Sequence, residues 1–212
     1  MILFLALLLS IAIALVRGGR FSCLAQTPLR YGWLAIAAFA LQWSIIYSPL
    51  PRTEGLLGAR TLLLIASYLL VVVVVVANRR LPGLSLIGVG LGLNLLVMLA
   101  NGGFMPVTLE AVERAGMSHL ALSTEPGARL LATKDIILPA EATRLWLLSD
   151  IFVVAPPCPL RTIFSLGDLF LAVGAFVFFQ RAMCPRLVPG PAGEPLRLEG
   201  STAHADSESS QH

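Results

Sequence analysis

Two aspartates near the C-terminal end of the chain have the type and spacing that could do chemistry. Asp150 ends the segment "LWLLSD", and Asp168 follows 18 residues later at the start of a long apolar run. Two carboxylates that lie close together cannot both ionise, so they share a proton: one form holds water as a base while the other protonates a carbonyl. The Pro-rich stretch "APPCP" between them sends the chain out and back, so both side chains can meet at one membrane face. This pattern predicts an aspartic peptidase.

A second interpretation of Asp168 requires no other carboxylate. Ser165 precedes it by three residues, and Ser-x-x-Asp before an apolar run is typical of a capping box, with the acid in the first turn near the positive helix end. On this interpretation Asp168 is a solvated, ionised cap that contributes roughly 1 kcal/mol. The sequence leaves both interpretations open.

The elements that position these side chains are long apolar segments. The chain has 57% hydrophobic and 13% charged residues, and its mean hydropathy is +0.83. A helix needs about 20 apolar residues to cross a bilayer, or somewhat fewer when flanking groups reach the interface. Five segments meet or approach this length: 1–16, 31–48, 61–77, 84–100 and 164–180. We therefore predict an all-α integral membrane protein, a bundle of five transmembrane helices.

The basic residues predict how this bundle is oriented. The arginines expected on one side are Arg17, Arg20, Arg30, Arg79, Arg80, Arg181 and Arg186. That side should be cytoplasmic, which places the N-terminus outside the inner membrane of the cell and the C-terminus inside. The pI of about 9.1 comes largely from these anchoring arginines, so the lipid bilayer, and no nucleic acid, is the expected partner.

The chain is expected to divide into a membrane domain, residues 1–184, and a tail, residues 185–212. The tail is rich in Pro, Gly and Ser and has little to bury, which predicts a disordered cytoplasmic segment. The connection 101–162 is long but neither Ser/Gly-rich nor heavily charged, so it should be ordered. We expect it to form a helical lid on the extracytoplasmic face.

Two short helical elements are predicted in this lid. The first, "LEAVERAGM", has Thr108 as its cap and Gly116 as its stop. The second runs from Pro139 to Leu148, with Pro at the first position and Glu141 in the first turn.

Few polar residues interrupt the apolar segments, and they predict contacts between helices. Gln42, Ser67 and Asn94 should hydrogen-bond across the bundle, because polar groups in lipid usually face its interior. The run "GVGLG", residues 88–92, predicts close helix packing.

A further set of residues could contact an oxyanion or a lipid head group if the chain is an enzyme. Arginine pairs well with carboxylate and phosphate, and the candidates are Asn101, Gly102, Gly103, Arg144 and Arg161. The alternative is that the Asn-Gly-Gly run ends the fourth segment as a turn. The arginines would then be interface anchors or ion-pair partners of the two aspartates.

The histidines and cysteines do not have the spacing of metal ligands, so we predict no metal site and no cofactor. These residues are His119, His204, His212, Cys23, Cys158 and Cys184.

The stretch 150–176, "DIFVVAPPCPLRTIFSLGDLFLAVGAF", resembles the C-terminal catalytic part of lipoprotein signal peptidase (signal peptidase II). In that family the second catalytic aspartate lies in a Phe-Asn-x-Ala-Asp pattern that opens the last helix. Phe164 and Asp168 match the pattern, while Ser165 stands where Asn is usual, and the family's Asn-x-x-Asp-Arg signature is absent before Asp150. The resemblance implies that the two aspartates are catalytic at the outer membrane face.

A broader resemblance involves four landmarks: "RGGR" at 17–20, "NGGFMPV" at 101–107, "ATRLWLLSD" at 142–150 and "FSLGD" at 164–168. They look like the ordered landmarks of an uncharacterised family of bacterial polytopic membrane proteins, which implies no activity. The first hypothesis is therefore a non-enzymatic bundle whose lid binds an unknown protein or lipid partner. The alternative is the aspartic peptidase, and a small-solute transporter is disfavoured because no charge lies deep in a helix.

Overall fold

The computed structural model describes residues 2–47, 58–131, 133, 135–157, 161–183, 187–188 and 197–198. Most of these residues are helical. The five longest helices are α1 (Ile2–Val16), α3 (Gly32–Tyr47), α4 (Ala59–Ala77), α5 (Leu84–Ala100) and α7 (Leu166–Met183). Their bounds agree within three residues with the five apolar segments of the sequence. A sixth, short helix, α2 (Phe21–Ala25), lies between α1 and α3.

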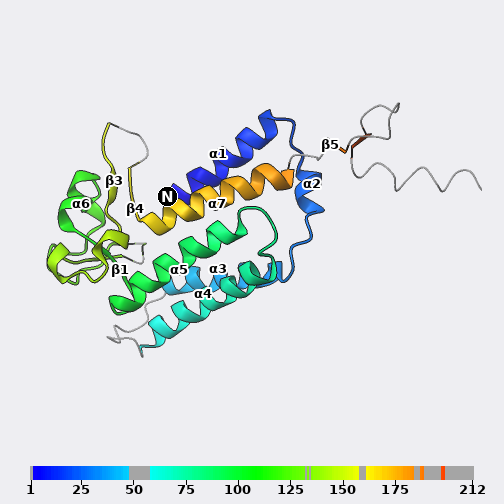
Figure 1. The fold of residues 1–212 in the computed structure, drawn as a ribbon. Helices are drawn as coiled ribbons and strands as arrows, with labels where there is room; N and C mark the ends of the chain where they lie inside the picture. The colour runs from blue at the N-terminus through cyan, green and yellow to red at the C-terminus, as the bar shows by residue number, and fades with distance from the viewer. Residues whose placement is uncertain are drawn as a thin grey trace, which may run out of the picture.

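The long helices pack side by side in the order α1, α7, α5, α4, α3 (Figure 1). Helices α1 and α7 run in the same direction, while α5 runs antiparallel to α7 and to α4. Helix α2 packs against α7 at one end of the bundle, and residues 101–165, which we name the cap unit, gather at the other end. The end of α5 and the start of α7, which flank the cap unit in the chain, therefore lie next to each other.

Among the described helices, α7 is long and apolar enough to cross a membrane by length and composition. Four shorter apolar stretches accompany it: Phe4–Val16, Gly32–Ile45, Thr61–Ala77 and Leu84–Ala100. The prediction of five transmembrane helices remains a prediction at this point.

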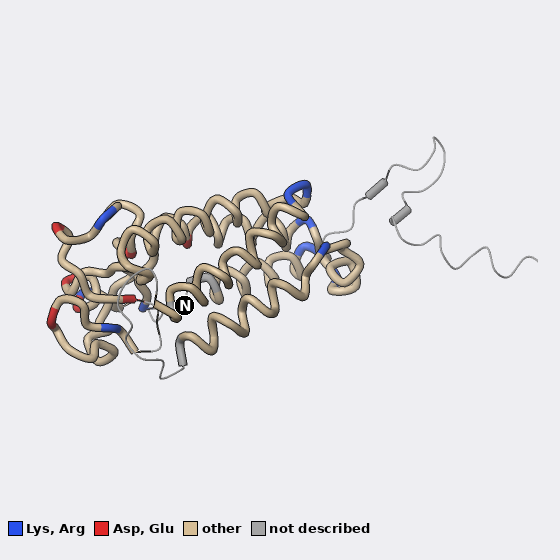
Figure 2. Tube along the Cα trace, turned by 90° about the horizontal axis from the view of Figure 1, so that it is seen from below, with Lys and Arg blue, Asp and Glu red and all other residues tan. Residues whose placement is uncertain are grey.

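The bundle carries apolar side chains on its outside as well as in its core. Buried residues that form the core include Leu64, Tyr68, Leu91, Val97 and Met98. Large apolar side chains that are half or more exposed on the long helices include Phe4, Leu9, Val16, Trp33, Ile36, Phe39, Trp43, Leu62, Leu69, Val76 and Leu96. The charged residues lie at the two ends of the bundle, and the length between them is almost free of charge (Figure 2).

The cap unit contains strands as well as helices. Strands β1 (Met105–Val107) and β2 (Asp135–Ile137) pair in parallel, and β3 (Phe152–Val154) pairs antiparallel with β4 (Thr162–Phe164). The unit has a small core of its own, formed by Val107, Ala111, Val112, Leu130 and Ile137. The chain is mostly helical, as predicted, but the predicted helical lid contains short paired strands as well as helices. The β-branched residues of these segments favour extended backbone in a part of the chain where strands can pair.

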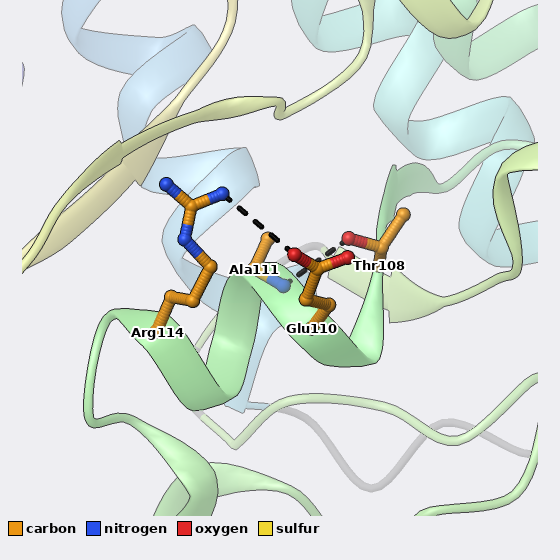
Figure 3. A network of polar contacts seen from close by, with 4 residues as sticks. All are labelled: Thr108, Glu110, Ala111 and Arg114. Atoms are coloured by element: carbon orange, nitrogen blue, oxygen red, sulfur yellow. Dashed lines mark hydrogen bonds and ion pairs between the residues drawn. The ribbon is translucent and has the colours of Figure 1, made fainter.

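Helix α6 (Leu109–Arg114) confirms the first predicted element of the cap unit (Figure 3). The backbone N–H of Ala111 donates to Thr108 Oγ1 at 3.2 Å, so Thr108 is the N-cap. Glu110 in the first turn lies 3.9 Å from Arg114 in the last turn, and both side chains are largely exposed. Gly116, with φ of +65°, follows the helix as the predicted stop.

The second predicted element, Pro139 to Leu148, is not one helix. It forms two single 3₁₀ turns, η2 (Ala140–Ala142) and η3 (Trp146–Leu148), and Leu145 between them has φ of +57°. The backbone is extended at Thr143, and the backbone N–H of Arg144 donates to Asn101 Oδ1 at 3.0 Å and not to a carbonyl one turn earlier. A third 3₁₀ turn, η1 (Ser118–Leu120), follows α6.

Within the predicted tail, two short strands are described, β5 (Leu187–Val188) and β6 (Arg197–Leu198), which pair antiparallel. The rest of the predicted disordered segment, 185–212, lies outside the described residues.

Candidate functional site

The start of α7 is a capping box, as one of the two interpretations of Asp168 predicts. Ser165 Oγ accepts the backbone N–H of Asp168 at 3.1 Å, and Asp168 Oδ2 accepts the backbone N–H of Ser165 at 3.4 Å. The expectation that this cap is solvated is wrong, because Ser165 is fully buried and only 9% of Asp168 is exposed. A buried carboxylate needs more partners than a surface cap does.

Asn94 on α5 supplies the missing partner and closes a ring of three side chains. Its Nδ2 donates to Asp168 Oδ1 at 2.8 Å, and its Oδ1 accepts the Ser165 hydroxyl at 2.9 Å. The Ser165 oxygen accepts the backbone N–H of Asp168, and the hydroxyl proton of Ser165 is donated to Asn94. The ring therefore fixes the orientation of the Asn94 amide, and both oxygens of Asp168 are engaged by donors.

Glycines let the two helices come close enough for this ring to form. A Cβ at Gly167 would overlap Asn94 Oδ1, and a Cβ at Gly90 would lie 2.5 Å from the carbonyl oxygen of Gly167. About two turns further along α7, a Cβ at Gly174 would lie 2.7 Å from the backbone nitrogen of Ile87. The predicted close packing of "GVGLG" is thus confirmed for Gly90. Gly92 in the same run has open space where a Cβ would be.

Asp150, the other proposed catalytic aspartate, is placed by the backbone of the cap unit. Its N–H donates to the carbonyl oxygen of Pro106 at 3.2 Å, it bridges in parallel to Val107, and only 5% of the residue is exposed. The pairing of Phe152 with Phe164 sets the chain after Asp150 beside the chain that leads into α7. The structure thus brings the two segments together, but it assigns the oxygens of Asp168 to Asn94 and Ser165. The proton-sharing pair remains a prediction.

Asn101 and Arg144, two of the proposed binding residues, are joined through the backbone of Arg144. Asn101 Nδ2 donates to the Arg144 carbonyl at 2.9 Å and to Val97 O at 2.8 Å, while Asn101 Oδ1 accepts the Arg144 N–H. This two-point clamp ties η3 to the end of α5. It uses both N–H groups of the Asn101 amide and one acceptor position of its oxygen, so the contacts of Asn101 hold the cap unit to α5.

Gly102 and Gly103 form the predicted turn at the end of α5, with φ of +73° and +92°. A Cβ on Gly103 would overlap Thr61 Oγ1 of α4, so glycine is required there by both backbone and space. Arg161, the remaining candidate, is exposed and lies beside the end of α6, where its Nη1 would be 3.4 Å from a Cβ on Gly116. Of the predicted binding residues, Asn101 and Arg144 contact each other, while Gly103 lies against Thr61 and Arg161 lies beside Gly116.

The other predicted contacts between helices are also present. Gln42 Nε2 on α3 donates to Ser67 Oγ on α4 at 3.2 Å. Sequence reasoning did not find Gln180, whose Nε2 donates to Ser10 O and whose Oε1 accepts from Arg17 Nη1 at 2.8 Å. It also did not pair Asn94 with Asp168. The signal was available, since Gly90 and Asn94 share a helix face and Gly167 precedes Asp168.

This arrangement is suited to holding helices together. Each side chain in the ring donates or accepts in a closed cycle, and the carboxylate takes up two donors in a buried position, which strengthens the bonds. In the part of the chain that the structure describes, no three His, Cys, Asp or Glu side chains gather as metal ligands would.

Comparison with known proteins gives two matches. The sequence profile of a family of unknown function, DUF5317, matches residues 26–180. An uncharacterised protein of Thermotoga maritima is 27% identical over 173 residues, which cover 80% of this chain and 87% of that protein. Neither match is to lipoprotein signal peptidase, and no solved structure matches the chain.

Proposed function

The chain belongs to the DUF5317 family of unknown function, and we propose that it is a multi-pass inner-membrane protein with a non-enzymatic role. In this proposal α1, α3, α4, α5 and α7 cross the membrane, and the cap unit lies at the outer face. The bundle would hold the cap unit in place to bind a protein or lipid partner. The observation that carries the non-enzymatic role is the closed ring of Asn94, Ser165 and Asp168.

The exposed apolar side chains support a membrane location. Trp33, Ile36 and Phe39 on α3 are 66%, 73% and 64% exposed, and comparable residues lie along the other long helices. Soluble monomers rarely expose apolar patches larger than a few hundred Å². The helices of 15 to 19 residues are about 23 to 29 Å long at about 1.5 Å per residue, close to the hydrocarbon thickness of about 30 Å.

The distribution of polar groups supports the same location. Ser10, Ser67 and Asn94 are buried inside the bundle and hydrogen-bonded, while charged residues occur at its ends (Figure 2). Arginines concentrate at the end that carries α2, and the positive-inside rule assigns that end to the cytoplasm. The cap unit would then be extracytoplasmic and the N-terminus outside.

The ring supports a structural role for Asp168. Its carboxylate accepts from Asn94 at 2.8 Å and from the backbone of Ser165. Both oxygens accept from buried donors, so holding α5 to the start of α7 is a sufficient role for this carboxylate. Leu122, Trp146 and Leu147 of the cap unit are 56%, 41% and 68% exposed, which suits a surface that meets a partner or lipid.

Labelling of single cysteines from one side tests this topology. In a background whose three native cysteines are replaced by serine, Ser123→Cys would lie in the cap unit and Gln26→Cys at the opposite end. A membrane-impermeant maleimide should label Ser123→Cys in intact spheroplasts and Gln26→Cys only after permeabilisation. Labelling of both positions in intact spheroplasts would contradict the proposal.

The aspartic peptidase is the second candidate, and one observation favours it: β3 pairs with β4, which sets the segments of Asp150 and Asp168 side by side. It predicts that the purified protein cleaves membrane-anchored peptides and that Asp150→Asn and Asp168→Asn each abolish cleavage with no loss of folding. The non-enzymatic proposal predicts no cleavage by wild type and a lower melting temperature for Asp168→Asn.

A further inference from the structure

A pocket of about 640 Å³ lies where α4 ends and the loop before α3 meets it. Three arginines line it: Arg30 from that loop and Arg79 and Arg80 directly after α4. All three are exposed. The pocket is on the arginine-rich end of the bundle, away from the cap unit and from the ring at the start of α7.

The buried side chain of Asn78 builds this pocket. Asn78 is 4% exposed, its Oδ1 accepts the backbone N–H of Arg30 at 2.8 Å, and its Nδ2 donates to Arg30 O and Val74 O, each at 2.8 Å. The amide thus fixes the backbone of Arg30 against the end of α4. This contact joins residues 48 positions apart in the chain and brings Arg30 to the same pocket that Arg79 and Arg80 line.

The described charges around the pocket are of one sign. The described acidic residues all belong to the cap unit or to the first turn of α7: Glu110, Glu113, Glu125, Asp135, Glu141, Asp150 and Asp168. They lie towards the opposite end of the bundle (Figure 2). Three arginines around one pocket attract an anion, and an anion with several oxygens can accept paired N–H bonds from their guanidinium groups.

The pocket also has an apolar side. Val76, on the last turn of α4, is 54% exposed, and Leu81 follows the arginines. In the proposed membrane location Val76 would face acyl chains next to the three cations. A ligand that matches both the cationic side and the apolar side of the pocket carries a phosphate group joined to a hydrocarbon chain.

We propose that Arg30, Arg79 and Arg80 form a binding site for the phosphate head group of an anionic phospholipid in the cytoplasmic leaflet. The site rests on the proposed membrane topology. Arg79 and Arg80 follow the C-terminal end of α4, where the helix dipole is negative, and this favourable interaction explains those two cations. It does not account for Arg30, whose backbone is held by Asn78 and which lines the same pocket from the loop before α3.

Binding of a tail-labelled phosphatidylglycerol to the full-length protein in detergent micelles tests the site. Phosphatidylcholine with the same tails is the neutral control. The double variant Arg79→Gln/Arg80→Gln should raise the Kd for phosphatidylglycerol about 30-fold, since each basic residue near anionic lipid contributes about fivefold. The matched double variant Arg20→Gln/Arg181→Gln removes the same charge from the same end but outside the pocket, and should change the Kd less than about twofold.

Each alternative outcome is distinct. Equal losses in the two double variants, or equal binding of phosphatidylcholine, would show diffuse attraction and overturn the site. Displacement of the lipid by millimolar inorganic phosphate would make this a free-phosphate site and overturn the lipid assignment. If Ser123→Cys and Gln26→Cys were labelled from the same side while the selective loss persisted, the topology would fall and the anion site would stand.

Discussion

Removing the charge of Asp168 should destabilise the bundle without unfolding the cap unit. In Asp168→Asn one side-chain oxygen can still accept the N–H of Asn94 or of Ser165, but the new NH₂ then faces the other donor. The variant loses one hydrogen bond to a charged group and leaves one buried donor unsatisfied. These effects cost about 2 to 3 kcal/mol together.

The exposed acid Glu110 provides the matched control. It also stands in the first turn of a helix, but its side chain is 80% exposed and its contact with Arg114 is 3.9 Å long. Glu110→Gln should therefore cost less than about 0.5 kcal/mol. Comparing the two variants separates burial from the general effect of an acid near a helix N-terminus.

Thermal unfolding of the purified protein in detergent, followed by circular dichroism at 222 nm, measures both. A loss of 2 to 3 kcal/mol lowers the melting temperature of a protein of this size by about 5 to 10 °C. Glu110→Gln should melt within about 2 °C of wild type. If Asp168→Asn melted as wild type does, the ring would not stabilise the structure and the reasoning from its geometry would be refuted.

The remaining predictions concern the positions around the ring. Gly167→Ala should cost about 2 kcal/mol or more, because the added Cβ overlaps Asn94 Oδ1. Gly92→Ala on α5, where the space for a Cβ is open, should be neutral or stabilise by up to about 1 kcal/mol. Equal losses for the two variants in the melting assay would contradict this. Asn101→Ala should cost about 2 kcal/mol and speed proteolysis of the cap unit, because it frees the backbone of Arg144; an unchanged digestion rate would argue against the clamp. Thr108→Ala should cost about 1 kcal/mol by removing the cap of α6. A urea titration that compares the unfolding free energies of the variant and wild type can measure this difference.

Local signals in the sequence were sufficient to locate the five long helices and α6, but not α2. The apolar blocks gave α5 its bounds at Leu84 and Ala100, and Ser-x-x-Asp located the start of α7 within two residues. Hydrophobicity and capping depend on neighbours in the chain, so they are visible without knowledge of the fold.

Contacts between segments that are far apart in the chain were harder to predict from the sequence. The break between η2 and η3 depends on Asn101, which lies 43 positions before Arg144, and propensity alone favours one continuous helix there. The burial of Asp168 depends on Asn94, 74 positions earlier. The short strands β1 and β2 were also not predicted, because three-residue strands carry almost no periodicity.

The most direct measurement of the central claim is the coupling free energy between Asn94 and Asp168. Unfolding free energies of Asn94→Ala, Asp168→Ala and the double variant form a double-mutant cycle. Because the two side chains belong to one closed ring with Ser165, we predict a coupling of about 1 to 3 kcal/mol, with the double variant losing less than the sum of the single variants. Additive losses within about 0.5 kcal/mol would contradict the account, since the two residues would then act independently.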